Sequence, residues 1–150
     1  MRIYLASDHA GFTLKNSLAA FLKNGGYEIV DCGPQEFEEH DDYPDYCIPL
    51  AQKVAQDKGS FGIVVGLSGQ GEAMAANRIP GARAAVFYGG EEEILTLSRE
   101  HNDANILSLG AKFISEEEAQ KALVYWLAIP FSGDERHVRR IAKLDVESLK

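Results

Sequence analysis

The strongest constraint on this chain is the alternation of short apolar runs with segments of helical periodicity. Five runs have the length and composition of buried strands: Ile3–Ala6, Tyr27–Asp31, Phe61–Gly66, Ala82–Phe87 and Ile106–Gly110. Strands that alternate with helices form right-handed βαβ units on one sheet. The pattern therefore predicts an α/β fold, a Rossmann-like three-layer sandwich with a five-stranded, mostly parallel sheet.

The segments between these runs have helical periodicity. The first helix shows one apolar face and then a glycine stop signal: Leu14, Leu18, Phe21, Leu22 and Asn24-Gly25-Gly26. Further helices are predicted to begin near Tyr43-Pro44 and at Ala73, and to span Glu91–Glu100, Ser115–Ile129 and Asp134–Leu149. Without a linker, repeat or low-complexity tract, residues 1–150 are predicted to form one domain. We expect the last helix, about 134–149, to pack on a partner subunit.

Composition narrows the classes of partner and compartment. The chain has 23 acidic and 15 basic residues, a formal charge of −8, which disfavours nucleic acid and anionic membranes as partners. Its first apolar run is too short for a signal peptide, and no run reaches the ~20 residues of a membrane span. Cys32 and Cys47 show neither metal-ligand spacing nor a disulfide framework. We therefore expect a cytoplasmic protein.

Ligands of open α/β sheets bind beyond the carboxyl ends of the strands, so the loops after the strands are the first place to look for chemistry. Asp8-His9 follows the first strand. An acid beside a histidine suits the handling of sugar hydroxyls and protons. A helix N-cap at Asp8 with an incidental His9 explains the same residues, and the spacing leaves both interpretations open.

The loop after the third strand, Ser68–Glu72, carries a stronger signal. Gly66, Gly69 and Gly71 allow the backbone N–H groups to turn toward a ligand just before a helix begins. Such a loop can hold a phosphate or a developing oxyanion, although it lacks the ending of a nucleotide P-loop. The alternative is a tight strand-to-helix turn in which Glu72 stabilises the first helical turn.

Two further segments are candidates for a site. His101-Asn102 precedes the last strand, so it should lie at the opposite edge of the sheet and reach a site mainly from a neighbouring subunit. Arg136 and Arg140 lie one helical turn apart, on either side of His137. Two guanidinium groups on one helix face suit a phosphate dianion. A solvated face paired with nearby acids is the alternative.

Five segments resemble the ribose-5-phosphate isomerase B family, in the family's order and over nearly the whole chain. They are Ser7-Asp8-His9-Ala10-Gly11-Phe12, Asp42-Tyr43-Pro44-Asp45, Ala75-Ala76-Asn77-Arg78, Arg99-Glu100-His101-Asn102 and Arg136-His137-Val138-Arg139-Arg140. The resemblance implies an aldose–ketose isomerase acting on ribose 5-phosphate and ribulose 5-phosphate. It also implies no metal, no organic cofactor, and homodimers or tetramers whose sites are shared between subunits.

The sequence departs from the family pattern at two positions. Many members carry a catalytic cysteine at the position of Gly66, whereas one branch has a Ser-Gly-x-Gly-Glu loop whose glutamate is the base. That loop here is Ser68–Glu72, so the resemblance places the base on Glu72 and on neither cysteine. Lys112 stands where that branch has a ligand-binding arginine, and lysine keeps the charge without the forked geometry.

Together with the chemistry of isomerisation, the resemblance implies a role for each candidate residue. Ring opening falls to His101, proton transfer to Glu72, and stabilisation of the enediolate to Ser68, Gly69, Gln70 and Gly71. The phosphate falls to Arg136 and Arg140 with His9 and His137, while Asp8, Tyr43 and Asn102 contact sugar hydroxyls or the loop. The sequence leaves open a six-carbon substrate such as allose or galactose 6-phosphate, and a sugar-phosphate binding protein without turnover.

Overall fold

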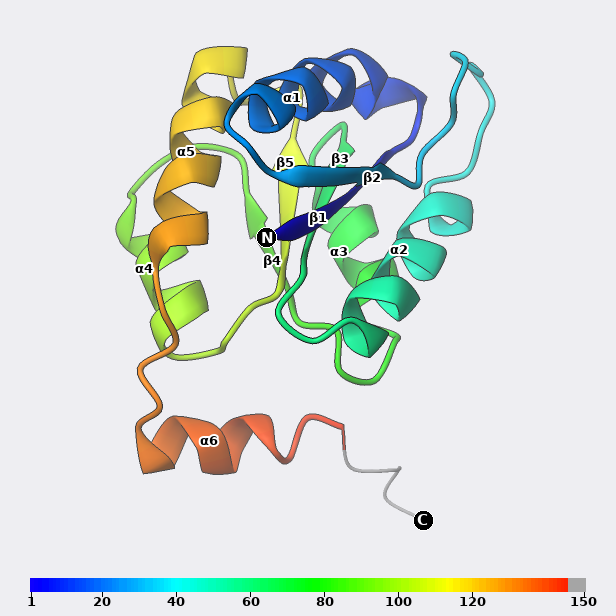
Figure 1. Ribbon diagram of the computed structural model, residues 1–150. Helices are drawn as coiled ribbons and strands as arrows, with labels where there is room; N and C mark the ends of the chain where they lie inside the picture. Colours follow the sequence, from blue (N-terminus) through cyan, green and yellow to red (C-terminus); the bar gives the residue numbers. More distant parts are fainter. Residues whose placement is uncertain (146–150) are drawn as a thin grey trace.

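The computed structural model describes residues 1–145 as an α/β fold, in which helices cover both faces of a five-stranded sheet (Figure 1). The strands are β1 (Arg2–Ser7), β2 (Glu28–Asp31), β3 (Phe61–Gly66), β4 (Ala84–Phe87) and β5 (Ile106–Gly110). The helices are the 3₁₀ helix η1 (His9–Gly11), α1 (Phe12–Asn24), α2 (Pro44–Gln56), α3 (Gln70–Ala76), α4 (Glu93–Glu100), α5 (Glu116–Ala128) and α6 (Glu135–Ile141). The predicted fold class is confirmed, and every strand pair is parallel.

Alternation along the strands builds two apolar cores, one on each face of the sheet. Ile3 of β1 faces the core that contains Leu18 of α1 and Trp126 of α5. Tyr4, its neighbour, faces the other core, which contains Leu50 of α2. Parallel sheets need both faces covered, and these two cores cover them. No helix in the described part of the chain is long and apolar enough to cross a membrane.

The strand order β2-β1-β3-β5-β4 places β1 and β3 side by side, so the two predicted ligand loops follow adjacent strands. From β1 the chain moves outward to β2 and then returns to form β3 on the other side of β1. The loops that leave β1 and β3 therefore diverge at the carboxyl edge, where open α/β sheets bind ligands. Gly11 of η1 packs so closely on β3 that a Cβ there would overlap the carbonyl of Val65.

Two predicted helix boundaries are wrong. α3 begins at Gln70 and not at Ala73, because Gly69 adopts a left-handed conformation (φ 78°) that completes the turn directly before the helix. α6 ends at Ile141, whereas a helix over Asp134–Leu149 is predicted; residues 142–144 form turns, and 146–149 lie outside the described residues. After α6 the Asp145 carboxylate accepts a hydrogen bond from the Gly81 N–H (3.0 Å), which draws the chain out of the helical path.

Candidate active site

The loops after β1 and β3 bring two buried carboxylates to the carboxyl edge of the sheet. Asp8 caps η1, because its Oδ1 accepts a hydrogen bond from the Gly11 N–H (3.1 Å). Glu72 lies in the first turn of α3 and is 4% exposed. The charge of Asp8 adds to the raised pKa of Glu72, so the two carboxylates are close enough to interact. The hydrogen bond from Gly11 confirms the predicted cap at Asp8. The capping residue is thus also a neighbour of Glu72.

The carboxyl group of Glu72 lies directly over the Cα atom of Gly66. A Cβ at position 66 would overlap the Oε1 and Cδ atoms of Glu72, so only glycine leaves room for this carboxyl group. Burial raises the pKa of Glu72 above its ordinary value, although its own backbone N–H acts in the opposite direction. The Glu72 carboxyl group thus occupies the space that a side chain on the last residue of β3 would fill.

The Ser68–Gly71 loop is held by its neighbours on two sides. The Gly69 carbonyl accepts a hydrogen bond from the Ser108 hydroxyl of β5 (2.5 Å). The Tyr43 ring lies across Gly71, where an added Cβ would come within 2.8 Å of a ring carbon. Within the loop, the Ser68 Oγ accepts from the Gln70 N–H (3.4 Å). Close packing against neighbouring residues is therefore a second reason for glycine at positions 69 and 71, beside the binding of a ligand.

The segment after β5 borders the same loop. The Lys112 backbone N–H donates to the Leu67 carbonyl (3.1 Å), and the Ala111 N–H donates to the Gly66 carbonyl (2.8 Å). The Lys112 side chain is exposed. A cationic side chain thus stands next to the Ser68–Gly71 loop, free to point toward an anion.

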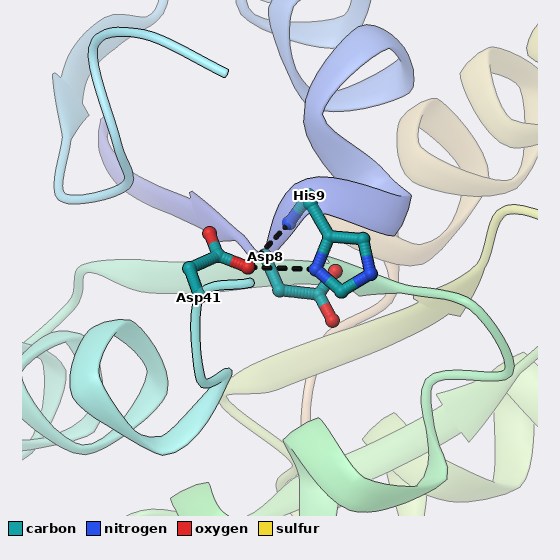
Figure 2. Close-up of side chains that lie close together, drawn as sticks. All are labelled: Asp8, His9 and Asp41. Carbon is teal, nitrogen blue, oxygen red and sulfur yellow. Dashed lines mark hydrogen bonds and ion pairs between the residues drawn. The ribbon is translucent and has the colours of Figure 1, made fainter. Parts of the chain in front are cut away.

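His9 is held by Asp41, a residue that the sequence patterns did not single out. The Oδ1 atom of Asp41 accepts a hydrogen bond from the His9 backbone N–H (2.9 Å) and lies 2.7 Å from the ring Nδ1 (Figure 2). Several acids crowd the segment 36–42, and nothing in its spacing distinguishes Asp41 from the others. Only the folding of this segment against η1 selects it.

Asp8, His9 and Asp41 also form a group of potential metal ligands, with one atom from each within 4.8 Å of the others. The facing atoms of His9 and Asp41 are already joined at 2.7 Å, the geometry of a hydrogen-bonded carboxylate–imidazole pair. We therefore describe the group as such a pair beside Asp8. The absence of a metal requirement stays a prediction.

The remaining candidate residues lie at the opposite, amino edge of the sheet. His101 and Asn102 precede β5, whose length separates them from the carboxyl edge by about 15 Å. The His101 ring lies against that of His137, with centroids 4.2 Å apart, and the buried His137 Nδ1 is 3.0 Å from the Ser132 Oγ. α6, below the sheet in Figure 1, also carries the exposed Arg136 and Arg140. One chain therefore does not bring the two groups together.

Neither cysteine has the character of a reactive thiolate. Cys47 of α2 is fully buried; burial raises the pKa of its thiol, and Glu72 and Asp8 add to the effect. Burial likewise raises the pKa of Cys32. Both cysteines are free, and both thiols stay neutral near pH 7, which makes them poor bases.

Comparison with known proteins identifies the family of this chain. The sequence pattern of the Ribose/Galactose Isomerase family matches residues 3–144. This chain belongs to that family. Among similar members of the ribose/galactose isomerase family, ribose-5-phosphate isomerase B of Mycobacterium tuberculosis is 42% identical over 141 residues, which cover 94% of this chain and 86% of the relative.

Solved structures of ribose/galactose isomerases share the fold. Ribose-5-phosphate isomerase B of Clostridium thermocellum superimposes with a TM-score of 0.90 at 41% identity, covering 97% of this chain and 95% of that one. The enzyme of Mycoplasma genitalium, solved with bound ribulose-5-phosphate, gives a TM-score of 0.89 at 38% identity, covering 95% and 93%. The whole described fold is therefore that of an isomerase, with its two groups of candidate residues at opposite edges of the sheet.

Proposed function

We propose that this isomerase interconverts D-ribose 5-phosphate and D-ribulose 5-phosphate by ring opening and an enediolate intermediate. Its relatives bear the name ribose-5-phosphate isomerase B, and one neighbouring structure holds ribulose-5-phosphate. In this chain the proposal depends above all on one observation, the buried carboxyl group of Glu72 over Gly66. A carboxylate in that position can remove a proton from the carbon next to the substrate carbonyl.

Glu72 acts as the base in this proposal and takes the place of a cysteine at position 66. The overlap of its carboxyl group with the space above Gly66 supports the exchange, because a base carried by α3 then reaches the point where β3 would present a side chain. Burial raises the pKa of Glu72 and so makes it a stronger base than an exposed carboxylate. The same group can then return the proton to the neighbouring carbon.

The enediolate oxygens need hydrogen-bond donors. The Ser68 hydroxyl and the backbone N–H groups of Gly69, Gln70 and Gly71 are our candidates, since they surround the first turn of α3 next to Glu72. Tyr43 lies across Gly71 of the same loop, Asp8 lies close enough to act on the pKa of Glu72, and both are assigned to the sugar hydroxyls. Lys112 adds a positive charge at its rim.

Ring opening and most of the phosphate binding are assigned to residues of the amino edge: His101, Asn102, Arg136, His137 and Arg140. His9, directly after β1, is the phosphate-binding candidate of the carboxyl edge. Because these lie far from Glu72 in one chain, the proposal requires a homodimer, or a tetramer built from such dimers. In it, the amino edge of one subunit faces the carboxyl edge of the other. We further propose that the enzyme works in the cytoplasm without metal or organic cofactor.

Steady-state rates on a panel of aldose phosphates test the proposal. We expect the highest kcat/KM on ribose 5-phosphate and lower values on allose 6-phosphate and galactose 6-phosphate. In deuterated water, the product should acquire deuterium at the carbon that loses its proton, and the Glu72→Gln variant should lose this exchange. Preference for a six-carbon substrate would correct the substrate, whereas binding without exchange would contradict catalysis.

A further inference from the structure

The pair formed by His9 and Asp41 has a strict proton requirement. A carboxylate can only accept hydrogen bonds, so the His9 Nδ1 that lies 2.7 Å from the Asp41 Oδ1 must carry the proton. The second ring nitrogen, Nε2, lies on the side of the ring away from Asp41 (Figure 2). It is therefore the nitrogen left for a ligand, and it donates a hydrogen bond only when the ring is cationic.

Asp41 is built into the protein as a fixed group. Its side chain is 4% exposed, while that of His9 is 39% exposed. The same Oδ1 atom also accepts the His9 backbone N–H (2.9 Å), so both the main chain and the ring of His9 are tied to one oxygen. Within residues 1–145 the Oδ2 atom has no hydrogen-bond partner, although the Tyr46 hydroxyl of α2 is close enough that burial and the charge of Asp41 together raise the pKa of Tyr46. A buried carboxylate with one unpartnered oxygen is costly, and its close contact with His9 offsets part of that cost.

We propose that Asp41 is a positioning residue, which keeps His9 cationic and aims its Nε2–H at the phosphate of the substrate. The anion's identity rests on the proposed function; the proton and the orientation of the ring do not. A cationic imidazole donating to a phosphate oxygen forms a charge-assisted hydrogen bond, stronger than a neutral one. Asp41 contributes to substrate binding through His9, without touching the substrate.

The acids beside His9 favour the cation. The hydrogen bond to Asp41 raises the pKa of His9 above its ordinary value, burial acts in the opposite direction, and Asp8, Asp41 and Glu39 raise it through their charges. A raised pKa means that His9 stays protonated to a higher pH than a free imidazole. Phosphate binding should consequently weaken at the pH where His9 loses this proton.

The first test uses the unmodified protein and needs no substrate. Nitrogen NMR of the histidine rings reports the pKa and the tautomer of His9, assigned by the loss of its signals in His9→Gln. We expect a pKa above the ordinary value and, at high pH, a neutral ring protonated on Nδ1. A ring that deprotonates to the Nε2–H tautomer would overturn the proposal, whatever the enzyme's substrate proves to be.

The second test removes the charge of Asp41 and keeps its shape. In Asp41→Asn we expect the His9 pKa to fall and KM for ribose 5-phosphate at pH 7.5 to rise roughly 3- to 10-fold, with kcat changed less than about twofold. Inorganic phosphate should perturb the His9 signals of the parent at lower concentration than those of the variant. Glu36→Gln removes an exposed charge from the same segment and serves as the matched control, with parental KM.

A double-mutant cycle separates action through His9 from a general effect on the fold. In a His9→Gln background, Asp41→Asn should raise KM no further, because the group through which it acts is gone. Equal and additive losses in the two backgrounds would overturn the proposal. So would an unchanged His9 pKa in Asp41→Asn.

Discussion

The side chain missing at Gly66 and the carboxyl group present at Glu72 are two parts of one feature. A residue at the end of β3 and another in the first turn of α3 compete for the same space, and glycine at the first position yields it to the second. Burial then gives the carboxyl group a raised pKa. The carboxyl group of a residue six positions later in the chain thus occupies the space above position 66, which is why we propose Glu72 as the base.

Replacement of Glu72 tests its role as the base. We expect Glu72→Gln to keep substrate binding and to lower kcat by at least ~10²-fold, the scale of losing a general base. Rates of the parent should rise with pH up to a pKa above that of an ordinary carboxyl, because only the ionised form accepts the proton. Turnover of the variant within a few-fold of the parent would show that Glu72 is only a helix-end charge.

A methyl group at position 66 tests the shared space directly. Gly66→Ala places a Cβ where the Glu72 carboxyl group lies, so we expect that group to move and kcat to fall by at least ~10-fold. Circular dichroism should show an intact fold. Gly25→Ala, at the end of α1 where φ is negative (−75°), is the control and should keep parental kcat. Unchanged turnover in Gly66→Ala would separate the base from this position.

The cysteines should be dispensable for turnover. Burial keeps both thiols neutral, and Cys47 has no exposed surface through which to meet a substrate. We expect Cys32→Ser combined with Cys47→Ala to retain kcat within a few-fold, at some loss of thermal stability from the cavity left by Cys47. Alkylation of the parent that abolishes activity and is prevented by substrate would contradict this.

At the scale of elements, α6 is a short helix that presents cations rather than an apolar face. Only His137 of its residues is buried, so the guanidinium groups of Arg136 and Arg140 contribute little to the core. Arg136 forms one exposed ion pair with Asp134 at 3.7 Å, too long and solvated to matter much for stability. These exposed cations are the reason that we propose the helix as the phosphate-binding element.

Alanine substitutions along α6 test this assignment. We expect Arg136→Ala and Arg140→Ala each to raise KM, with a loss of about 1.5–3 kcal/mol in binding free energy, the scale of a charge-assisted hydrogen bond. The melting temperatures should not change. Arg139→Ala should raise KM less, because the side chain at position 139 points about 100° away from that of Arg140 around the helix. Inorganic phosphate should inhibit the parent and lose most of its effect on the first two variants. Equal small effects of all three would make the cluster a surface feature.

At the scale of the whole molecule, the candidate residues divide between opposite edges of one sheet. Glu72 lies in the first turn of α3 at the carboxyl edge, and His101 lies directly after α4 at the amino edge, with its ring against that of His137 in α6. A proton transfer and a ring opening on one small sugar need both groups within contact distance. A second copy of the chain is the simplest way to bring them together.

Mixed dimers test the shared site. Glu72→Gln and His101→Ala should each be nearly inactive alone. If sites combine residues of two subunits, unfolding and refolding an equal mixture should restore about a quarter of parental activity, because half of the dimers carry one intact site of two. No recovery, with heterodimers demonstrated by mass spectrometry, would place each site within one chain.

The alternation of apolar runs and helical periodicity was sufficient to predict the five strands, the order of the helices and the fold class. These features depend on near neighbours in the chain, whose spacing decides which side chains share a face. The Ser68–Glu72 loop could be singled out for the same reason, since its glycines and its carboxylate are adjacent. Helix ends were less predictable. The left-handed conformation of Gly69 lets α3 begin at Gln70, three residues before the predicted start, and the hydrogen bond between Gly81 and Asp145 accompanies the end of α6.

Only the tertiary structure decided which loops meet and which acid matters. The reversal of strand order beside β1 sets the loop of Asp8 next to that of Glu72, and it follows from long-range pairing rather than from any local pattern. Asp41 is one of several acids in its segment until the chain folds and gives it a buried contact with His9. Local periodicity specifies elements, whereas contacts between distant residues depend on the packing of the whole chain, and the site is made of such contacts.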